Sequence, residues 1–464
     1  MKVRTGLFIL IFASLCEFVH AQRPRNSNVS PDLTGSVLQG TAAAGTIQLS
    51  VNDVIDRALK YNLGGIISEQ ETRISKANRV RALSELMPKV NAGITETVQQ
   101  INLGAFGFGG FPGHPPVVGP FSVFDARARY THPILDFRLL HELRAASEQV
   151  TASNYALQDI RELIVLFTTG LYLEAVADSS RVEAARAQLR TAQAVYDRAR
   201  DLKDSGLIAG IDVLRAQVQL QGQQQRLVGV ENEFTKQKLK LARSIGLPQG
   251  QEFTQTDTFI DVPPSSSVLA EALNTALNSR SDYRRALSLV RAAEETRKAA
   301  LGRRLPSHHF NADYGDIGRT PTHSHGTMFV RGTLSIPIYT GERVRAEVVE
   351  SDAMLEQRNA EASNLRDRIE FEIRTADLDI RSAADQLQVA QTAKDLAQQQ
   401  LIQAQDRFAA GVANGLEVTQ AQEAVATADE NYISSLFALN AAEAALARAT
   451  GNAEKTIKSI YGGK

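Results

Sequence analysis

The titratable side chains of this 464-residue chain could bind ions or set local charge, but their spacing does not predict catalysis. Histidines that are conceivable metal ligands gather around one segment: His308, His309, His323 and His325, with His114 far upstream. No acid or cysteine completes a ligand set there, so solvated strand ends and loops are the better interpretation. The sequence has no Ser-His-acid motif and no phosphate-binding glycine loop. We therefore predict a protein that is not an enzyme and that uses no metal or other cofactor.

Other charged side chains occupy two kinds of recurring position. Arg127, Arg129 and Arg331 fall on the polar faces of segments in which apolar and polar residues alternate. Asp212 and Glu417 each stand six residues after a glycine, in the first turn of a helical pattern. An acid at a helix start is favoured by the helix dipole, which explains both acids without any function.

The surroundings of these two acids are one sequence written twice. Residues 206–213 read GLIAGIDV and residues 411–418 read GVANGLEV, an offset of 205 positions. The same offset relates LARSIG at 241–246 to LARATG at 446–451. A constant offset held by glycine, acidic and apolar positions predicts two copies of one structural unit.

Each copy predicts the same order of elements: helix, strand, strand, very long helix, turn and return helix. The first and the long helical patterns run over about 51–86 and 136–205 in the first copy, and about 269–305 and 342–410 in the second, and the return helices end at about 245 and 450. The alternating patterns predict strands at about 89–99 and 121–133, and at about 307–316 and 325–338. Pro88 and Pro306 end the first helix of each copy.

The N-terminus predicts export. Lys2 and Arg4 precede a short apolar run, and Ala21 offers a cleavage site. The single cysteine, Cys16, is interpreted as part of this signal and not as a lipoprotein cysteine, because the preceding leucine is bulky. No later stretch is apolar for long enough to cross a membrane as a helix, so an exported chain that crosses one must use strands.

Composition and boundaries complete the outline. With 51 basic and 52 acidic residues the formal net charge is −1, which gives no indication of nucleic-acid binding. We expect a signal peptide, a flexible lead-in, a first repeat, a linker, a second repeat and a C-terminal tail, at residues 1–21, 22–47, 48–250, 251–266, 267–452 and 453–464.

The expected fold is mostly α with a small β part. Four strands cannot close a barrel, whereas a homotrimer would supply twelve. The long helices have thin, alanine-rich apolar stripes, which suit a hollow wall of helices better than a thick core. The combination predicts a trimeric conduit in which a β-barrel continues into a long helical barrel.

The duplication, the order of elements and the paired turns resemble the TolC-like outer membrane efflux protein family. The resemblance covers about residues 48–452, and the paired turns and the paired Leu-Ala-Arg-x-x-Gly helix ends are its most specific part. The stretch from Phe408 to Gln422 is very typical of the second copy of the family. It implies a homotrimer with a 12-stranded outer-membrane β-barrel, in contact with lipid, and a periplasmic α-helical barrel that holds most of the mass. It also implies a periplasmic adaptor (a membrane fusion protein) and an inner-membrane transporter of the RND or ABC type as partners.

The resemblance also assigns roles at the turns. Glu417 falls where the family commonly places an acidic gate residue, and Gln420 occupies a second gate position that is often acidic in relatives. Asp212 would be the partner of a basic latch residue, but Ala413 stands at the basic position, so that latch is absent. The residues expected at the adaptor-docking tips are Gly206, Leu207, Gly210, Gly411, Val412 and Gly415. Arg127, Arg129 and Arg331 would line the barrel lumen.

Three functions remain open from the sequence. The first is the passive outer-membrane channel of a tripartite efflux system for small molecules. The second is the outer-membrane conduit of a type I protein secretion system, which would use the same fold. The third is a periplasmic coiled-coil scaffold without a pore, which the long polar helices fit and the four alternating segments do not.

Overall fold

The computed structural model describes residues 33–38, 40–42, 45–107, 115–259 and 269–462. The predicted signal peptide with Cys16, His114 and residues 260–266 of the predicted linker lie outside the described residues.

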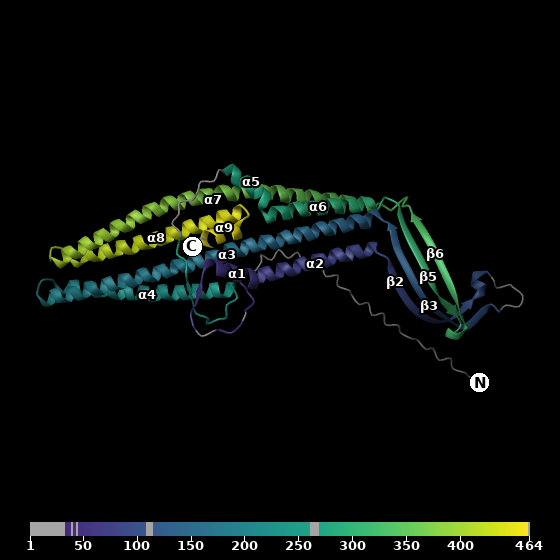
Figure 1. The fold of residues 1–464 in the computed structure, drawn as a ribbon, viewed down its shortest axis with the longest axis horizontal. Coiled ribbons are helices and arrows are strands. Elements are labelled where there is room, and N and C mark those ends of the chain that lie inside the picture. Colours follow the sequence, from purple (N-terminus) through teal and green to yellow (C-terminus); the bar gives the residue numbers. More distant parts are fainter. Residues whose placement is uncertain (1–32, 39, 43–44, 108–114, 260–268, 463–464) are drawn as a thin grey trace, which may run out of the picture.

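The described chain is elongated, with a β-sheet at one end and two helical hairpins that turn at the other (Figure 1). Two helices run along most of its length, α3 (Phe137–Asp204) and α7 (Arg343–Ala409). At about 1.5 Å per residue, the 68 residues of α3 extend roughly 100 Å. Shorter helices accompany them: α2 (Leu63–Leu86), α4 (Gly210–Ser244), α6 (Ser281–Gly302) and α8 (Gly415–Ala449). The order α2, two strands, α3, α4 recurs as α6, two strands, α7, α8, which confirms the predicted duplication.

The first predicted helix of each copy is broken in two, which is a correction to the sequence-based outline. The first copy contains α1 (Val51–Tyr61) and then α2, and the second contains α5 (Leu269–Ser279) and then α6. Asn62 has an extended backbone, and its side-chain oxygen accepts a hydrogen bond of 2.9 Å from the amide of Gly64. An asparagine that caps a new helix in this way stops the preceding one. Arg280 is extended at the second break.

The strands form one antiparallel sheet that both copies build. Its order is β2 (Lys89–Asn102), β3 (Val117–Leu135), β5 (Ser307–Gly318) and β6 (Ser324–Ser335), so that the β3–β5 pair joins the copies. Short 3-10 helices, η1 (Leu103–Phe106) and η2 (Pro321–His323), lie in the loops after β2 and β5.

The strand ends differ from the predicted ones. β3 starts at Val117 and continues through Pro133 to Leu135, beyond the predicted range 121–133. The pairing register shifts after Pro133, where the missing amide hydrogen is tolerated at an irregularity. β6 ends at Ser335, short of the predicted residue 338, because Pro337 cannot donate to the ladder.

A compact core surrounds the middle of the molecule. There β1 (Ile47–Leu49) pairs in parallel with β4 (Phe253–Gln255), and α9 (Ala453–Gly462) packs against α1, α3 and α8. The described part of the predicted C-terminal tail is therefore a docked helix. Ile457 is buried, and the hydroxyl of Tyr461 donates to the side chain of Asn440 at 2.8 Å. The apolar residues of α9 recur every four positions, which gives this short segment one face to bury.

Candidate functional site

The turns that end α3 and α7 have the same backbone geometry. Gly206 and Gly411 both adopt φ of 72°, in the left-handed region that favours glycine. The amide of Leu207 donates to the carbonyl of Leu202 at 2.8 Å, and the amide of Val412 donates to that of Arg407 at 3.0 Å. These six-residue hydrogen bonds close Schellman motifs. The repeat of glycine at positions 206 and 411 is therefore explained by two identical helix ends.

The two hairpin tips pack against each other. A buried cluster joins α3 and α4 to α7 and α8; its members are Ala199, Leu202, Val213, Ala216, Ala404, Phe408, Val418 and Ala421. Gly415 is buried where the tips meet, and a Cβ atom built on it would lie 3.6 Å from the side-chain oxygen of Asp212. The two turns therefore lie side by side at one end of the molecule (Figure 1).

The outer surface of the tips carries exposed apolar side chains at equivalent positions of the two repeats. Leu207 is 69% exposed and its counterpart Val412 is 68% exposed. Ile211 and its counterpart Leu416 are also exposed. Solvent-facing aliphatic groups gathered at the end of a rod are typical of a surface that another protein covers.

The tip acids are not free carboxylates. A carboxylate oxygen of Glu417 lies 3.0 Å from Nε of Arg407, across the turn from the end of α7. Asp212 lies 3.1 Å from the guanidinium of Arg215, one turn further along α4. Gln420 is exposed and occupies the position that Arg215 has in the first copy. The sequence interpretation named the three predicted gate residues but missed Arg407. The only feature of the sequence that could have identified Arg407 was the turn itself, because a Schellman turn places the last turn of one helix beside the first turn of the next.

The sheet has one polar and one apolar face. The register places Arg129 opposite Asn91 and Asp313, and the next polar row holds Thr131, Asn311 and Arg331. Arg127 lies one row on the other side of Arg129, so the three predicted lumen arginines share a face. The opposite face exposes apolar side chains: Val90, Ile94, Val98, Met328, Val330 and Leu334.

The three arginines are in different surroundings. Arg127 is bonded to Asp125 at 3.1 Å, to Asp313, and to the hydroxyl of Thr327 at 3.2 Å. Arg331 stacks on Phe329 with its guanidinium carbon 4.6 Å from the ring centroid. Neither Arg129 nor Arg331 has a salt bridge to any residue that the structure describes.

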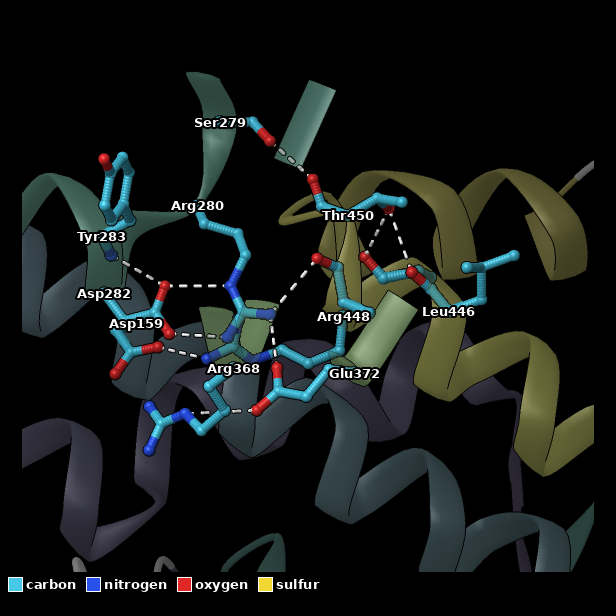
Figure 2. A network of polar contacts seen from close by, with 12 residues as sticks. Asp159, Ser279, Arg280, Asp282, Tyr283, Arg368, Glu372, Leu446, Arg448 and Thr450 are labelled. Carbon is cyan, nitrogen blue, oxygen red and sulfur yellow. Dashed lines mark hydrogen bonds and ion pairs between the residues drawn. The ribbon is translucent and has the colours of Figure 1, made fainter. Parts of the chain in front are cut away.

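A buried charged cluster that the sequence interpretation missed joins four helices at the middle of the molecule (Figure 2). Arg280, at the break between α5 and α6, has a side chain only 3% exposed and bonds to Asp282 at 2.6 Å and to Glu372 of α7. It also donates to the carbonyl of Ala449, at the end of α8, at 3.3 Å. Arg448 pairs with Asp159 of α3. We call this set the helix junction: Asp159, Arg280, Asp282, Glu372 and Arg448.

Burial and pairing act in opposite directions on the acids of the helix junction. Burial raises the pKa of Asp159, and the neighbouring charge of Arg448 offsets only part of this. Burial also acts to raise the pKa of Asp282, but its hydrogen bond and charge interaction with Arg280 outweigh burial, and the pKa is lowered. A groove of about 780 Å³ lies beside these residues, between α3, α6, α7 and α8.

The helix junction has a simpler equivalent in the first repeat. The side-chain amide of Asn62 donates to the carbonyl of Ser244 at 3.4 Å, as the guanidinium of Arg280 does to the carbonyl of Ala449. Gly246 and Gly451, which follow these carbonyls, both have positive φ. A Cβ atom on Gly451 would lie 2.9 Å from the Cα atom of Arg280, so the close approach also requires glycine there. The repeated LAR-x-x-G ending is therefore the segment against which each helix break packs.

The histidines do not converge. His308 and His309 are neighbours on β5 and point to opposite faces of the sheet, and His323 bonds to threonine hydroxyls in its own loop. Within the described ranges, no group of three or more His, Cys, Asp or Glu side chains is arranged to hold a metal ion. No helix among the described residues is both long and apolar enough to cross a membrane.

Comparison with known proteins agrees with this geometry. The family model for outer membrane efflux proteins matches residues 69–247 and 272–452, one match in each repeat. No curated protein matches the chain.

Solved structures share the fold at low sequence identity. A crystal structure of CusC, described in terms of transmembrane channel formation, has a TM-score of 0.76 and 17% identity, covering 89% of this chain and 95% of that one. The Campylobacter jejuni CmeC outer membrane channel has a TM-score of 0.75 and 17% identity, with 88% of each chain covered. VceC of Vibrio cholerae has a TM-score of 0.74 and 17% identity, covering 86% of this chain and 96% of that one. The chain belongs to the outer membrane efflux protein family, whose fold is that of TolC-like channels.

Proposed function

We propose that the protein is the passive outer-membrane channel of a tripartite efflux system. It would conduct small molecules from an inner-membrane pump of the RND or ABC type, through a periplasmic adaptor, to the outside. The observation that carries the proposal is that two different surfaces lie at opposite ends of the molecule. One end is a sheet with one apolar and one polar face, and the other end, about 100 Å away along α3, is a pair of exposed hairpin tips. In this proposal the channel itself is passive, and the partners supply the energy for transport.

A homotrimer accounts for the unpaired surfaces of the single chain. In the layer of helices that leads to the tips, α3 packs on α4 and α8, and α8 packs on α7. This order leaves α4 and α7 at the two edges of the layer. Exposed apolar side chains follow one stripe of α7, at Phe371, Leu378, Val389 and Leu396. Others lie on α4, at Leu214, Val218, Val228 and Leu239. The α7 edge of one copy would cover the α4 edge of the next, and three copies would close both the helical wall and a 12-stranded barrel.

The sheet supports the same assembly. Closing the strand edges would turn the apolar face toward outer-membrane lipid and the face of Arg127, Arg129 and Arg331 toward the lumen. The long helices would then extend from the membrane, placing most of the mass in the periplasm.

The tips would serve as gate and docking site. Glu417, Gln420 and Asp212 would lie where the helical barrel narrows, and Arg407 and Arg215 would neutralise the two acids. The exposed apolar groups of Leu207 and Val412, carried on the turns of Gly206, Gly210, Gly411 and Gly415, would contact the adaptor.

The test is a deletion strain complemented with variants. Leu207→Glu combined with Val412→Glu should leave the protein in the outer membrane but abolish efflux of a fluorescent dye, because charged groups cannot be buried against an apolar partner surface. The matched control is Leu207→Met combined with Val412→Leu, which keeps apolar side chains at both tips and should retain dye efflux. Normal dye efflux in the tip variant would refute adaptor docking at the tips. Unchanged dye efflux in the deletion strain, with a protein missing from its medium, would favour type I secretion instead. Recovery of the wild type in the soluble periplasmic fraction would favour the scaffold.

A further inference from the structure

The polar face of the sheet carries more positive than negative charge. Its strands contribute four cations, Lys89, Arg127, Arg129 and Arg331, and two carboxylates, Asp125 and Asp313. Lys89 is paired with Glu85 at 2.7 Å, at the end of α2. The charges of this face are therefore unequally compensated, and the pairing decides which cations remain available.

Arg127 takes both carboxylates of the sheet. Asp313 lies directly opposite Arg129 in the strand register, yet its carboxylate bonds to Arg127 on the diagonal. The side chains of Arg127, Asp125 and Asp313 are 15%, 25% and 19% exposed, so this group is a cross-strand clamp that offers little surface to a solute. Arg129 is left exposed beside Asn91, without a carboxylate partner among the described residues.

Arg331 is the second available cation. Its guanidinium lies over the ring of Phe329, and the register places Phe329 in the same row as Arg129 and Asp313. The two free arginines are thus one row apart, on either side of β5, and the ring of Phe329 lies against Arg331. Guanidinium groups bind carboxylate, sulfate and phosphate oxygens, and an aromatic ring offers an apolar contact beside them.

We propose that Arg129 and Arg331 form an anion-selective zone in the sheet, so that the channel prefers organic anions: solutes with a carboxylate, sulfonate or phosphate next to an apolar group. The inference rests on the proposed function, because only the closed trimer turns this face into a lumen. Three copies would place six unpaired guanidinium groups around one axis, and charged rings of this kind set the ion preference of a pore. The tips do not oppose anions, because Glu417 and Asp212 are each paired with an arginine.

The test is the reversal potential of the purified protein in planar bilayers under a potassium chloride gradient, with chloride then replaced by naphthalenesulfonate. The wild type should be anion-selective and should admit naphthalenesulfonate. Arg129→Gln and Arg331→Gln should each lower the anion-to-cation permeability ratio by about twofold or more, and the double variant should lower it further. Arg129→Lys should retain the preference, because it retains the charge.

Two controls separate this zone from net charge and from folding. Arg127→Gln combined with Asp313→Asn removes one charge of each sign from the clamp and should leave the permeability ratio unchanged. Glu96→Gln changes a charge on the other face of the sheet and should also have no effect. A cation-selective wild type, or a permeability ratio that Arg129→Gln and Arg331→Gln do not change, overturns the anion zone while the channel stands. A protein that forms no conducting pore overturns the proposed channel, and the anion zone with it.

Discussion

At the scale of residues, the molecule uses arginine to neutralise acids at its tips. The charge of the duplicated acid is paired differently in each repeat: Asp212 pairs with Arg215 on its own helix, and Glu417 pairs with Arg407 across the turn. Both pairs are partly exposed, and ion pairs at such sites contribute little to stability. Their effect is on local charge, which matters wherever solutes must pass a narrow opening.

Removing Arg407 and removing Glu417 should therefore shift the ion preference in opposite directions. Arg407→Ala exposes the carboxylate of Glu417 and should shift selectivity toward cations, with stronger block by a trivalent cation such as hexaamminecobalt. Glu417→Ala leaves Arg407 unpaired and should shift selectivity toward anions, with weaker block. Bilayer conductance with and without hexaamminecobalt measures both. If the two variants shift selectivity in the same direction, the pair does not face the conducting path.

At the scale of elements, the two repeats have the same outline and different internal joints. In each repeat the glycine that ends the return helix packs against a helix break. Asn62 makes this contact in the first repeat, and the charged helix junction makes it in the second. Buried ion pairs are costly to break because one charge is then left uncompensated in a low-dielectric site. The second repeat is therefore held at its middle by long-range charge pairs that connect α3, α6, α7 and α8.

The duplication supplies a matched pair of variants for this joint. Arg448 has a side chain 11% exposed and pairs with Asp159, whereas its counterpart in the first repeat, Arg243, is exposed. Arg448→Met should lower the free energy of unfolding by about 3 kcal/mol, because Asp159 stays buried without its cation. Arg243→Met should change it by about 0.5 kcal/mol or less, as exposed substitutions do. Denaturant unfolding in detergent, followed by circular dichroism, measures both. Equal losses in the two variants would mean that the buried pair adds no stability.

At the scale of the whole molecule, a single copy leaves too much apolar surface in contact with water. The stripe on α7 and the aliphatic groups on α4 lie at the two edges of the helical layer, and the sheet exposes one apolar face. Surfaces of this extent are covered in the working protein. In the proposed trimer, lipid would cover the apolar face of the sheet and neighbouring copies would cover the helix edges.

The seam between copies can be tested at one position of α7. Val389→Asp places a charge in the exposed stripe and should convert trimers to monomers in mild detergent, because that carboxylate would have to be desolvated on assembly. Gln388→Asp adds the same charge to the adjacent residue, about 100° around the helix, and should leave the trimer intact. Native mass spectrometry distinguishes the two states. An intact trimer with Val389→Asp would place the seam elsewhere.

The sequence by itself determined what depends on short-range patterns. The alternation of the strands, the long runs of helix formers and the offset of 205 positions predicted the fold class and the duplication, and the structure and the family match confirm both. The tip glycines were readable because a left-handed turn restricts the residue at a single position. The helix breaks were not readable, because Asn62 and Arg280 interrupt patterns that are otherwise helical.

Only the tertiary structure decided which charges are paired. Arg127 meets Asp313 from 186 residues away, and Arg448 meets Asp159 from 289 residues away. These contacts depend on the register between β3 and β5 and on how the second repeat docks on α3, and neither is encoded in a local pattern. The three arginines of the sheet look equivalent in the sequence. They differ in the folded chain because Asp125 of the same strand and Asp313 on the diagonal both pair with Arg127, which leaves Arg129 and Arg331 without a carboxylate partner among the described residues.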